Sequence, residues 1–158
     1  MLDEAALTAG DIMTRDVAVV HPDTSLLEAV TLMADRRIGG MPVIDGDTIV
    51  GILCEADVIR WHEDFSERQT RWLDTLADGH PLAEEFLDSL RDQHRRVGTL
   101  MTLGVITVSE NMLARDVAHL MHSENINRVP VVRDERLVGI ITRADLVRAL
   151  AKKLAELP

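Results

Sequence analysis

The sequence predicts an α+β fold in which one β-α-β-β-α unit occurs twice, with a two-helix insert between the copies. The first observation is a repeat, since GILCEADV at residues 51–58 returns as GIITRADL at 139–146. The same register aligns residues 10–60 with 98–148 without an insertion. The second observation is that β-rich runs alternate with runs of helical periodicity in each copy. The third is a spacer, residues 61–96, with two apolar stripes of its own.

Each copy is predicted to run from a short strand through an amphipathic helix and a hairpin to a final helix. Ser25 and Glu28 are spaced for a capping box at the start of the first helix. Pro42 and Pro130 suit strand starts, where the ladder needs no N–H from them. The expected elements are strands at 17–20, 41–44 and 49–53 with a helix from near Glu55, and strands at 105–108, 129–132 and 137–141 with a helix from near Arg143.

The chain is accordingly divided into repeat 1 (10–60), a helical insert (61–96), repeat 2 (97–150) and the end of the C-terminal helix (151–158). The chain has two Trp, two Phe and no Tyr, and all four aromatic residues lie in the insert. Two interpretations of the insert stay open. In the first, its helices cover apolar core residues that would otherwise be exposed. In the second, its aromatic side chains form a dimer or partner surface.

Composition narrows the class of protein. The formal net charge is −10, which disfavours binding to a phosphate backbone, so no nucleic-acid partner is expected. The single cysteine, Cys54, excludes a disulfide framework within one chain. The N-terminal residues are acidic and no long apolar run follows, so neither a signal peptide nor membrane insertion is expected. The expected location is the cytoplasm.

Catalytic and metal motifs are not found. The sequence has no G-x-S-x-G, no H-E-x-x-H and no Walker-type loop, so we expect no enzyme activity. His119 and His122 could share a helix face, but two ligands do not make a metal site. A buried, inert thiol is the default for Cys54.

Taken together, the motifs resemble the CBS domain, named after cystathionine beta-synthase. They are the Met-Thr pairs at 13–14 and 101–102, the h-P-V-h strands and the G-h-h-x-x-x-D endings. The resemblance implies that the repeats pair through their sheets into a Bateman module, and that two modules form a homodimeric disc of four repeats. It also implies a regulatory role in which an adenosine compound controls a partner protein. Because the chain carries no obvious output domain, the partner would be regulated in trans.

The resemblance also implies two ligand clefts, each built from both repeats. Thr142 and Asp145 alone predict a capping box. In CBS domains similar to this one, the matching Asp holds the ribose and the matching hydroxyl lies near the phosphate. Arg128 is the natural phosphate partner, or else a member of a surface ion pair. The main cleft would comprise Thr14, Ala18, Ile38, Gly39, Asn127, Arg128, Thr142, Ala144 and Asp145.

The second cleft departs from this pattern at two positions. Cys54 stands where Thr142 stands in the other copy, and thiols are poor hydrogen-bond donors. Gly40 stands where Arg128 stands, so the phosphate would lack a cation. This cleft is therefore expected to be weaker or vacant. Its members would be Gly40, Cys54, Ala56, Asp57, Thr102, Ile106 and Ile126.

The sequence thus predicts a regulatory module that binds AMP, ADP or ATP and requires no cofactor. Arg128 favours a phosphate over a sulfonium. Two alternatives remain: a structural dimerisation or interaction module with degenerate clefts, and a sensor of S-adenosylmethionine.

Overall fold

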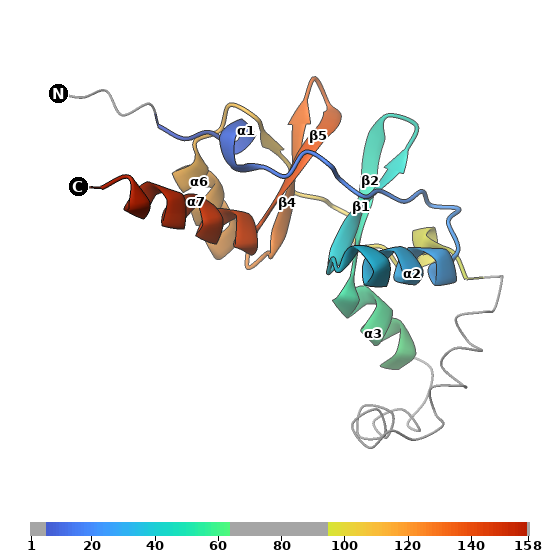
Figure 1. Cartoon of the computed structure of the whole chain (residues 1–158). Helices are drawn as coiled ribbons and strands as arrows, with labels where there is room; N and C mark the ends of the chain where they lie inside the picture. The colour runs from blue at the N-terminus through green and yellow to red at the C-terminus, as the bar shows by residue number, and fades with distance from the viewer. Residues whose placement is uncertain (1–5, 64–94, 158) are drawn as a thin grey trace, which may run out of the picture. The chain divides into compact units, whose positions relative to one another are not determined.

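The computed structural model describes residues 6–63 and 95–157, which form two compact units. Unit 1 combines Met1–Val17 with Ile106–Pro158, and unit 2 is Ala18–Val105. Both units mix helices with a small sheet, so the predicted α+β class is confirmed (Figure 1). The two-helix insert was predicted for residues that lie mostly outside the described part, and it stays a prediction.

Unit 1 is built on a three-stranded sheet in the order β3-β4-β5. Strand β3 runs parallel to β4, and β4 is antiparallel to β5. The buried side chains of this unit form one apolar core, which includes Met13, Val117, Val131 and Ile141. Its elements are α1 (Ala9–Ile12), β3 (Val108–Ser109), α6 (Ala114–Ser123), β4 (Arg128–Arg133), β5 (Arg136–Thr142) and α7 (Arg143–Ala155).

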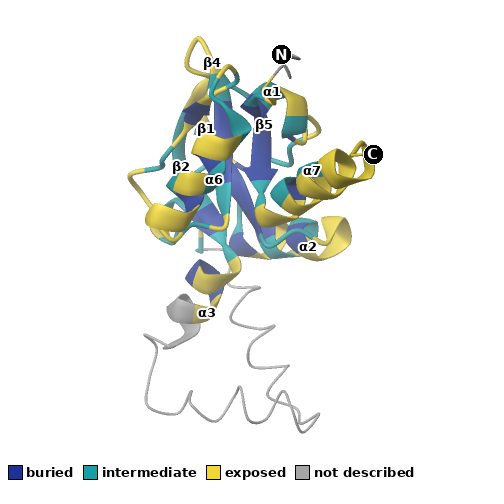
Figure 2. Ribbon diagram, turned by 90° about the vertical axis from the view of Figure 1, so that its left-hand side faces the viewer, coloured by how far each residue is buried: buried dark blue, intermediate teal, exposed yellow. Residues whose placement is uncertain are grey.

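Unit 2 repeats this plan around the antiparallel hairpin β1-β2. Leu26, Met41, Val43 and Leu53 are among the buried residues of its separate core. Figure 2 shows the same division in both units, with buried strands and helices whose outer surfaces are exposed. Its elements are α2 (Leu26–Arg36), β1 (Gly40–Asp45), β2 (Thr48–Cys54), α3 (Glu55–Glu63) and the short helix η1 (Val97–Thr99).

The Met-Thr segment of each repeat packs in the unit that is built mainly from the other repeat. In unit 1, Thr14 and Ile140 exchange two backbone hydrogen bonds, each of 2.9 Å. In unit 2, Thr102 and Ile52 do the same, at 2.8 and 3.0 Å. Each hairpin therefore gains one further bridge from a segment that is distant in sequence.

The glycine of each G-h-h motif makes room for the methionine of the incoming segment. A Cβ atom on Gly139 would lie 2.3 Å from the sulfur of Met13, and one on Gly51 would lie 2.7 Å from the sulfur of Met101. Cβ contacts this short do not occur in folded proteins, because interiors are close-packed. The repeated Met and Gly are therefore the two halves of one packing contact.

The predicted strand over 17–20 is reduced to one bridge, between Val20 and Val43, because prolines interrupt the parallel ladder. Val20 donates to the Pro42 carbonyl and accepts from Ile44. The next bond on either side would need an N–H from Pro42 or Pro22, and proline has none.

In repeat 2 the parallel pairing is one residue longer. Glu110 stands where repeat 1 has Pro22 and can donate an N–H, and β3 accordingly covers two residues. The strands β1 and β4 also begin two residues before their prolines, so the prediction that proline opens them is wrong. Pro42 is tolerated inside β1 because its partner Ile52 directs its N–H and carbonyl to Thr102 instead.

The predicted helix starts agree with the structure. The hydroxyl of Ser25 accepts the N–H of Glu28 at the start of α2, which is the serine half of the predicted capping box. The final helices begin at Glu55 and Arg143, as expected.

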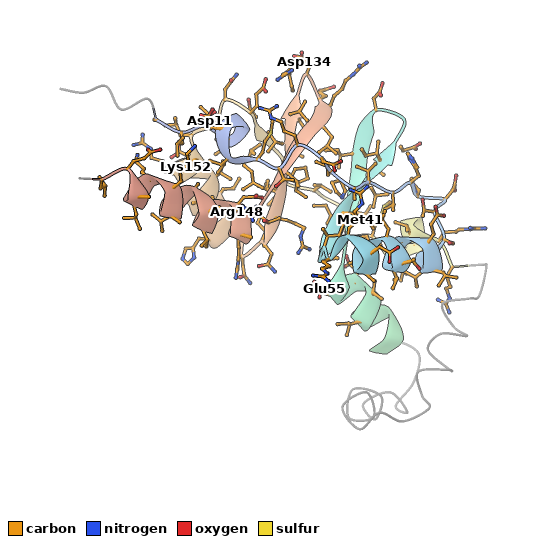
Figure 3. The ribbon with its side chains drawn as sticks, in the orientation of Figure 1. Asp11, Met41, Glu55, Asp134, Arg148 and Lys152 are labelled. Atoms are coloured by element: carbon orange, nitrogen blue, oxygen red, sulfur yellow. The ribbon has the colours of Figure 1, made fainter. Side chains whose placement is uncertain are left out.

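The turn between β4 and β5, where Figure 3 labels Asp134, holds two residues in the left-handed region. They are Asp134 with φ 50° and Glu135 with φ 65°. Hairpins use such turns because they match the strand twist, and glycine adopts them without a Cβ penalty. We expect Glu135→Gly to raise the free energy of unfolding by about 0.5–1 kcal/mol, measured by urea denaturation.

The matched control for this change is Asp47→Gly in the hairpin of unit 2. Asp47 holds the equivalent turn position but is not among the described residues with positive φ. Glycine there relieves no left-handed conformation and adds freedom to the unfolded chain, so it should lower stability. Equal effects of the two glycines would contradict the assignment of strain to Glu135.

Candidate functional site

The candidate site in unit 1 is built at the junction of β5 and α7. Thr142 ends the strand and caps the helix, and Asp145 lies in the first helical turn. The Thr142 N–H donates to Oδ2 of Asp145 at 2.8 Å, and the Asp145 N–H donates to the Thr142 hydroxyl at 3.4 Å. The predicted capping box is therefore confirmed.

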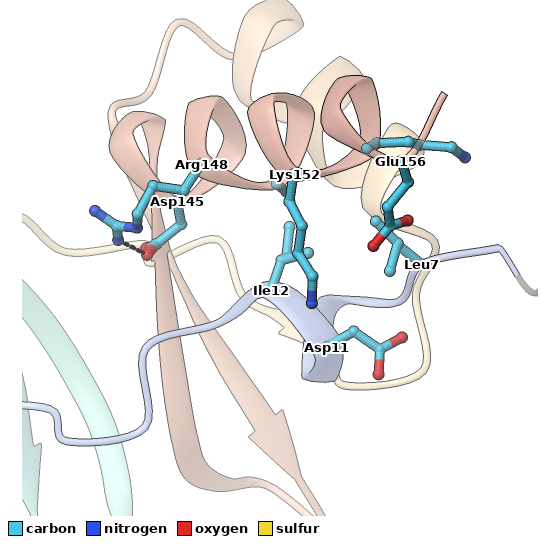
Figure 4. Close-up of a pocket in the computed structure, with 9 residues that line it drawn as sticks. Leu7, Asp11, Ile12, Asp145, Arg148, Lys152 and Glu156 are labelled. Atoms are coloured by element: carbon cyan, nitrogen blue, oxygen red, sulfur yellow. Dashed lines mark hydrogen bonds and ion pairs between the residues drawn. The ribbon is translucent and has the colours of Figure 1, made fainter. Parts of the chain in front are cut away.

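The carboxylate of Asp145 is almost fully buried, with 3% of the residue exposed. Besides the backbone bond, Oδ2 accepts the Thr142 hydroxyl at 3.1 Å. Its other oxygen, Oδ1, accepts the Thr14 hydroxyl at 2.9 Å and is bonded by the Arg148 guanidinium (Figure 4). A buried charge requires such donors, because desolvation without them is costly.

Unit 2 contains the same arrangement around Asp57, of which 6% is exposed. The Cys54 N–H donates to Oδ2 at 2.8 Å, and the Thr102 hydroxyl donates to Oδ1 at 2.8 Å. The backbone bond and the distant threonine are therefore common to both units. The change from Thr142 to Cys54 replaces a hydroxyl donor by a thiol, which is a weak one.

The neighbouring strand ends also match in the two units. Arg128 begins β4 opposite Thr142, and Gly40 begins β1 opposite Cys54. The carbonyl of Asn127 accepts the N–H of Arg143 at 3.2 Å, as the carbonyl of Gly39 accepts that of Glu55 at 3.0 Å. Unit 1 thus places a cation on the strand beside the helix start, where unit 2 has a buried glycine.

The predicted site residues divide between the units. Unit 1 brings together six members of the predicted main cleft: Thr14, Asn127, Arg128, Thr142, Ala144 and Asp145. Unit 2 holds the remaining three, Ala18, Ile38 and Gly39, together with Gly40, Cys54, Ala56, Asp57 and Thr102 from the predicted second cleft. Ile106 and Ile126 belong to unit 1, where they pack against its core. The sequence analysis predicts that residues of both units combine in each ligand cleft, and this stays a prediction.

Two contacts to Asp145 were not anticipated from the sequence. One is the hydroxyl of Thr14, which was predicted as a member of the main cleft but not as a partner of Asp145. The other is Arg148, and here a signal was present, since opposite charges three residues apart share a helix face.

A cavity of about 300 Å³ adjoins Asp145 between α1 and α7 (Figure 4). Arg148 and Lys152 line it from α7, and Asp11 lines it from α1. The backbone N–H and the hydroxyl of Thr8 hold the pKa of Asp11 below its usual value. The cavity is therefore lined by both positive and negative charges.

Over the described ranges, 6–63 and 95–157, no three His, Cys, Asp or Glu side chains are grouped as a metal site would require. In the same part of the chain, no helix is long and apolar enough to span a membrane.

Comparison with known proteins now identifies this arrangement. The model of the CBS domain matches the chain twice, over residues 9–64 and 97–152. The chain belongs to the CBS-domain family. It is a CBS domain pair, and the duplicated Met-Thr and Gly-to-Asp motifs are those of its two domains.

Relatives of this CBS pair occur in archaea and plants. An uncharacterized protein of Methanocaldococcus jannaschii, MJ1426, is 36% identical over 150 residues, which are 89% of this chain and 89% of that protein. The chloroplastic CBS domain-containing protein CBSX2 of Arabidopsis thaliana is 33% identical over 90% of this chain, and the match spans 63% of CBSX2.

Two solved structures of similar proteins contain adenosine compounds. The crystal structure of CBSX2 in complex with AMP matches with a TM-score of 0.71 and 30% identity, covering 94% of this chain and 98% of that one. The CBS domain pair of MJ0100, in complex with methylthioadenosine and S-adenosylmethionine, matches with a TM-score of 0.67 and 25% identity over 94% of this chain and 98% of that one.

Proposed function

We propose that this CBS pair is a regulatory module that binds an adenosine nucleotide at Asp145 and modulates a partner protein in trans. The observation that carries the proposal is the buried carboxylate of Asp145 at the start of α7. Acidic side chains accept a ribose hydroxyl in dinucleotide-binding folds. The AMP bound to the related CBSX2 supports this class of ligand.

Among adenosine ligands, a phosphorylated one fits the charges of unit 1 best. Arg128 at the start of β4 supplies a guanidinium beside the Thr142 cap. Guanidinium groups bind phosphates with two parallel hydrogen bonds. AMP, ADP or ATP would therefore bind near Asp145, whereas Gly40 offers no such group near Asp57.

A sensor of S-adenosylmethionine is the second candidate. The ligands of MJ0100 support it, because that CBS pair contains S-adenosylmethionine and methylthioadenosine. The ribose contact to Asp145 would be the same, but Arg128 would face a sulfonium.

The proposal is tested by isothermal titration of the full chain with AMP, ADP, ATP and S-adenosylmethionine. We expect saturable binding of an adenine nucleotide at about one site per chain. Absence of heat with all four ligands, together with no shift in thermal melting, would refute nucleotide sensing and favour the structural interaction module.

Regulation would follow from linkage between the ligand and the partner. A ligand shifts a conformational equilibrium only by its difference in affinity for the two states. Coupling of this kind amounts to about 1–3 kcal/mol in most proteins. The regulated partner would therefore respond to nucleotide by roughly five- to 150-fold in affinity.

We further propose that the chain forms a homodimer through α7. Val147, Leu150 and Leu154 lie along one side of this helix and are about 60% exposed or more. Beside them is an apolar groove of about 580 Å³, lined by residues of α6 and α7.

The change Leu150→Asp is expected to convert the dimer to monomers in analytical ultracentrifugation, because an unpaired charge would be buried at the centre of the contact. Leu103→Asp is the matched control, since Leu103 is a similarly exposed leucine that belongs to unit 2 and is not part of α7. A Leu150→Asp protein that remained dimeric would exclude this helix as the interface.

A further inference from the structure

Both oxygens of Asp145, to which a ribose would bind, already accept hydrogen bonds from groups of the protein. A carboxylate offers about four acceptor positions. Thr142 fills two of them with its N–H and hydroxyl, and Thr14 and Arg148 fill the two on Oδ1. Two ribose hydroxyls can therefore bind only if donors already present give way.

The four donors differ in how easily they can leave. The Thr142 N–H is fixed by the helix cap, and the Thr14 hydroxyl is carried by a backbone that exchanges two hydrogen bonds with Ile140. The Arg148 side chain is 66% exposed, whereas that of Asp145 is 3% exposed. Water can solvate Arg148 once it moves, so it is the donor whose displacement costs least.

We propose that Arg148 is a specificity-determining residue that competes with the ribose for Asp145 and so favours anionic over uncharged adenosine ligands. This inference rests on the proposed function. A neutral nucleoside must displace Arg148 from Asp145, and it has no phosphate to which the released guanidinium could bind. A nucleotide also displaces it, but its phosphate is attracted to the released guanidinium, because the group stays on the same helix turn as the carboxylate.

The test compares adenosine with AMP on wild-type protein, Arg148→Gln and Lys152→Gln. Lys152 is the matched control, since it lies one turn further along α7, lines the same cavity and carries the same charge (Figure 4). Arg148 is exposed and easily solvated, so removing it as a competitor should strengthen adenosine binding to Arg148→Gln by only about two- to five-fold. AMP should gain less or lose affinity, so the preference for AMP over adenosine falls in this variant.

The measured quantity is the dissociation constant for adenosine divided by the dissociation constant for AMP. A general loss of stability does not change this ratio. A ratio that falls in Arg148→Gln and holds in Lys152→Gln supports the inference. Ratios that are unchanged in both variants, or fall equally in both, overturn it while leaving the proposed function intact. Absence of adenosine and AMP binding in all three proteins would overturn this inference, and the proposed function would fall with it only if ADP, ATP and S-adenosylmethionine also failed to bind.

Discussion

Replacing Asp145 by asparagine should weaken nucleotide binding by about 100-fold. The carboxylate would offer the ribose charge-assisted hydrogen bonds, each contributing about 1.5–3 kcal/mol. An amide of the same shape keeps one neutral acceptor and turns a donor toward the donors that Asp145 now accepts. Isothermal titration with the nucleotide that the wild-type protein binds best would measure the loss.

Asp57→Asn is the matched control for Asp145→Asn. Both carboxylates are buried, and each accepts a backbone N–H at 2.8 Å and a threonine hydroxyl at the start of a helix. Both variants should therefore lose a similar stability, about 1–3 kcal/mol. Only Asp145→Asn should lose binding, because the cap of Asp57 has Cys54 and Gly40 in place of Thr142 and Arg128.

Two results would contradict this picture. Equal losses of affinity in both variants would show that the units bind ligand alike, and the predicted inequality of the clefts would then be wrong. Unchanged affinity in Asp145→Asn would remove this aspartate from the ligand site.

The second large effect is expected from Gly139→Val, which should lower the free energy of unfolding by about 2–3 kcal/mol. A Cβ atom on Gly139 would lie 2.3 Å from the Met13 sulfur and 3.0 Å from the carbonyl oxygen of Thr14. The side chain of Met13 can move, but the Thr14 backbone is held by its bonds to Ile140. Chemical denaturation followed by circular dichroism would measure the loss.

The double variant Met13→Ala with Gly139→Val isolates this contact. Met13→Ala alone removes a buried side chain and should cost about 2 kcal/mol or more. In the double variant, the valine occupies part of the space that Met13 leaves. The combined loss should therefore be smaller than the sum of the single losses, by about 1 kcal/mol or more. Additive losses would mean that residues 13 and 139 do not pack together.

Features that depend on neighbours in the chain were predictable. The strand and helix order, the Ser25 cap and the Thr142–Asp145 capping box rest on contacts within three or four residues, and their spacing is visible in the sequence. The placement of Asp145 at a helix start was therefore predicted correctly. The duplication was visible for the same reason, because it is a property of the order of residues alone.

A predicted element was wrong where two segments that are distant in sequence act on one another. The strand over 17–20 fails because Pro22 and Pro42 both remove donors from one ladder, and neither proline alone shows this. One error was local instead: the left-handed conformation of Glu135 was not foreseen, because its turn contains no glycine.

The tertiary structure supplied the bonds that join each Met-Thr segment to its unit, a pairing that the resemblance to CBS domains implied but that the local pattern of residues leaves open. Thr14 bonds Asp145 across 131 positions, and Thr102 bonds Asp57 across 45. Both copies carry the same motif, so the local pattern of either one fits both partners equally well. The choice comes from packing, in which Met13 covers Gly139 and Met101 covers Gly51. By itself, the sequence determined two equivalent motifs with an aspartate near the start of a helix in each, and the fold decided that these aspartates are buried and which donors, including Arg148, surround them.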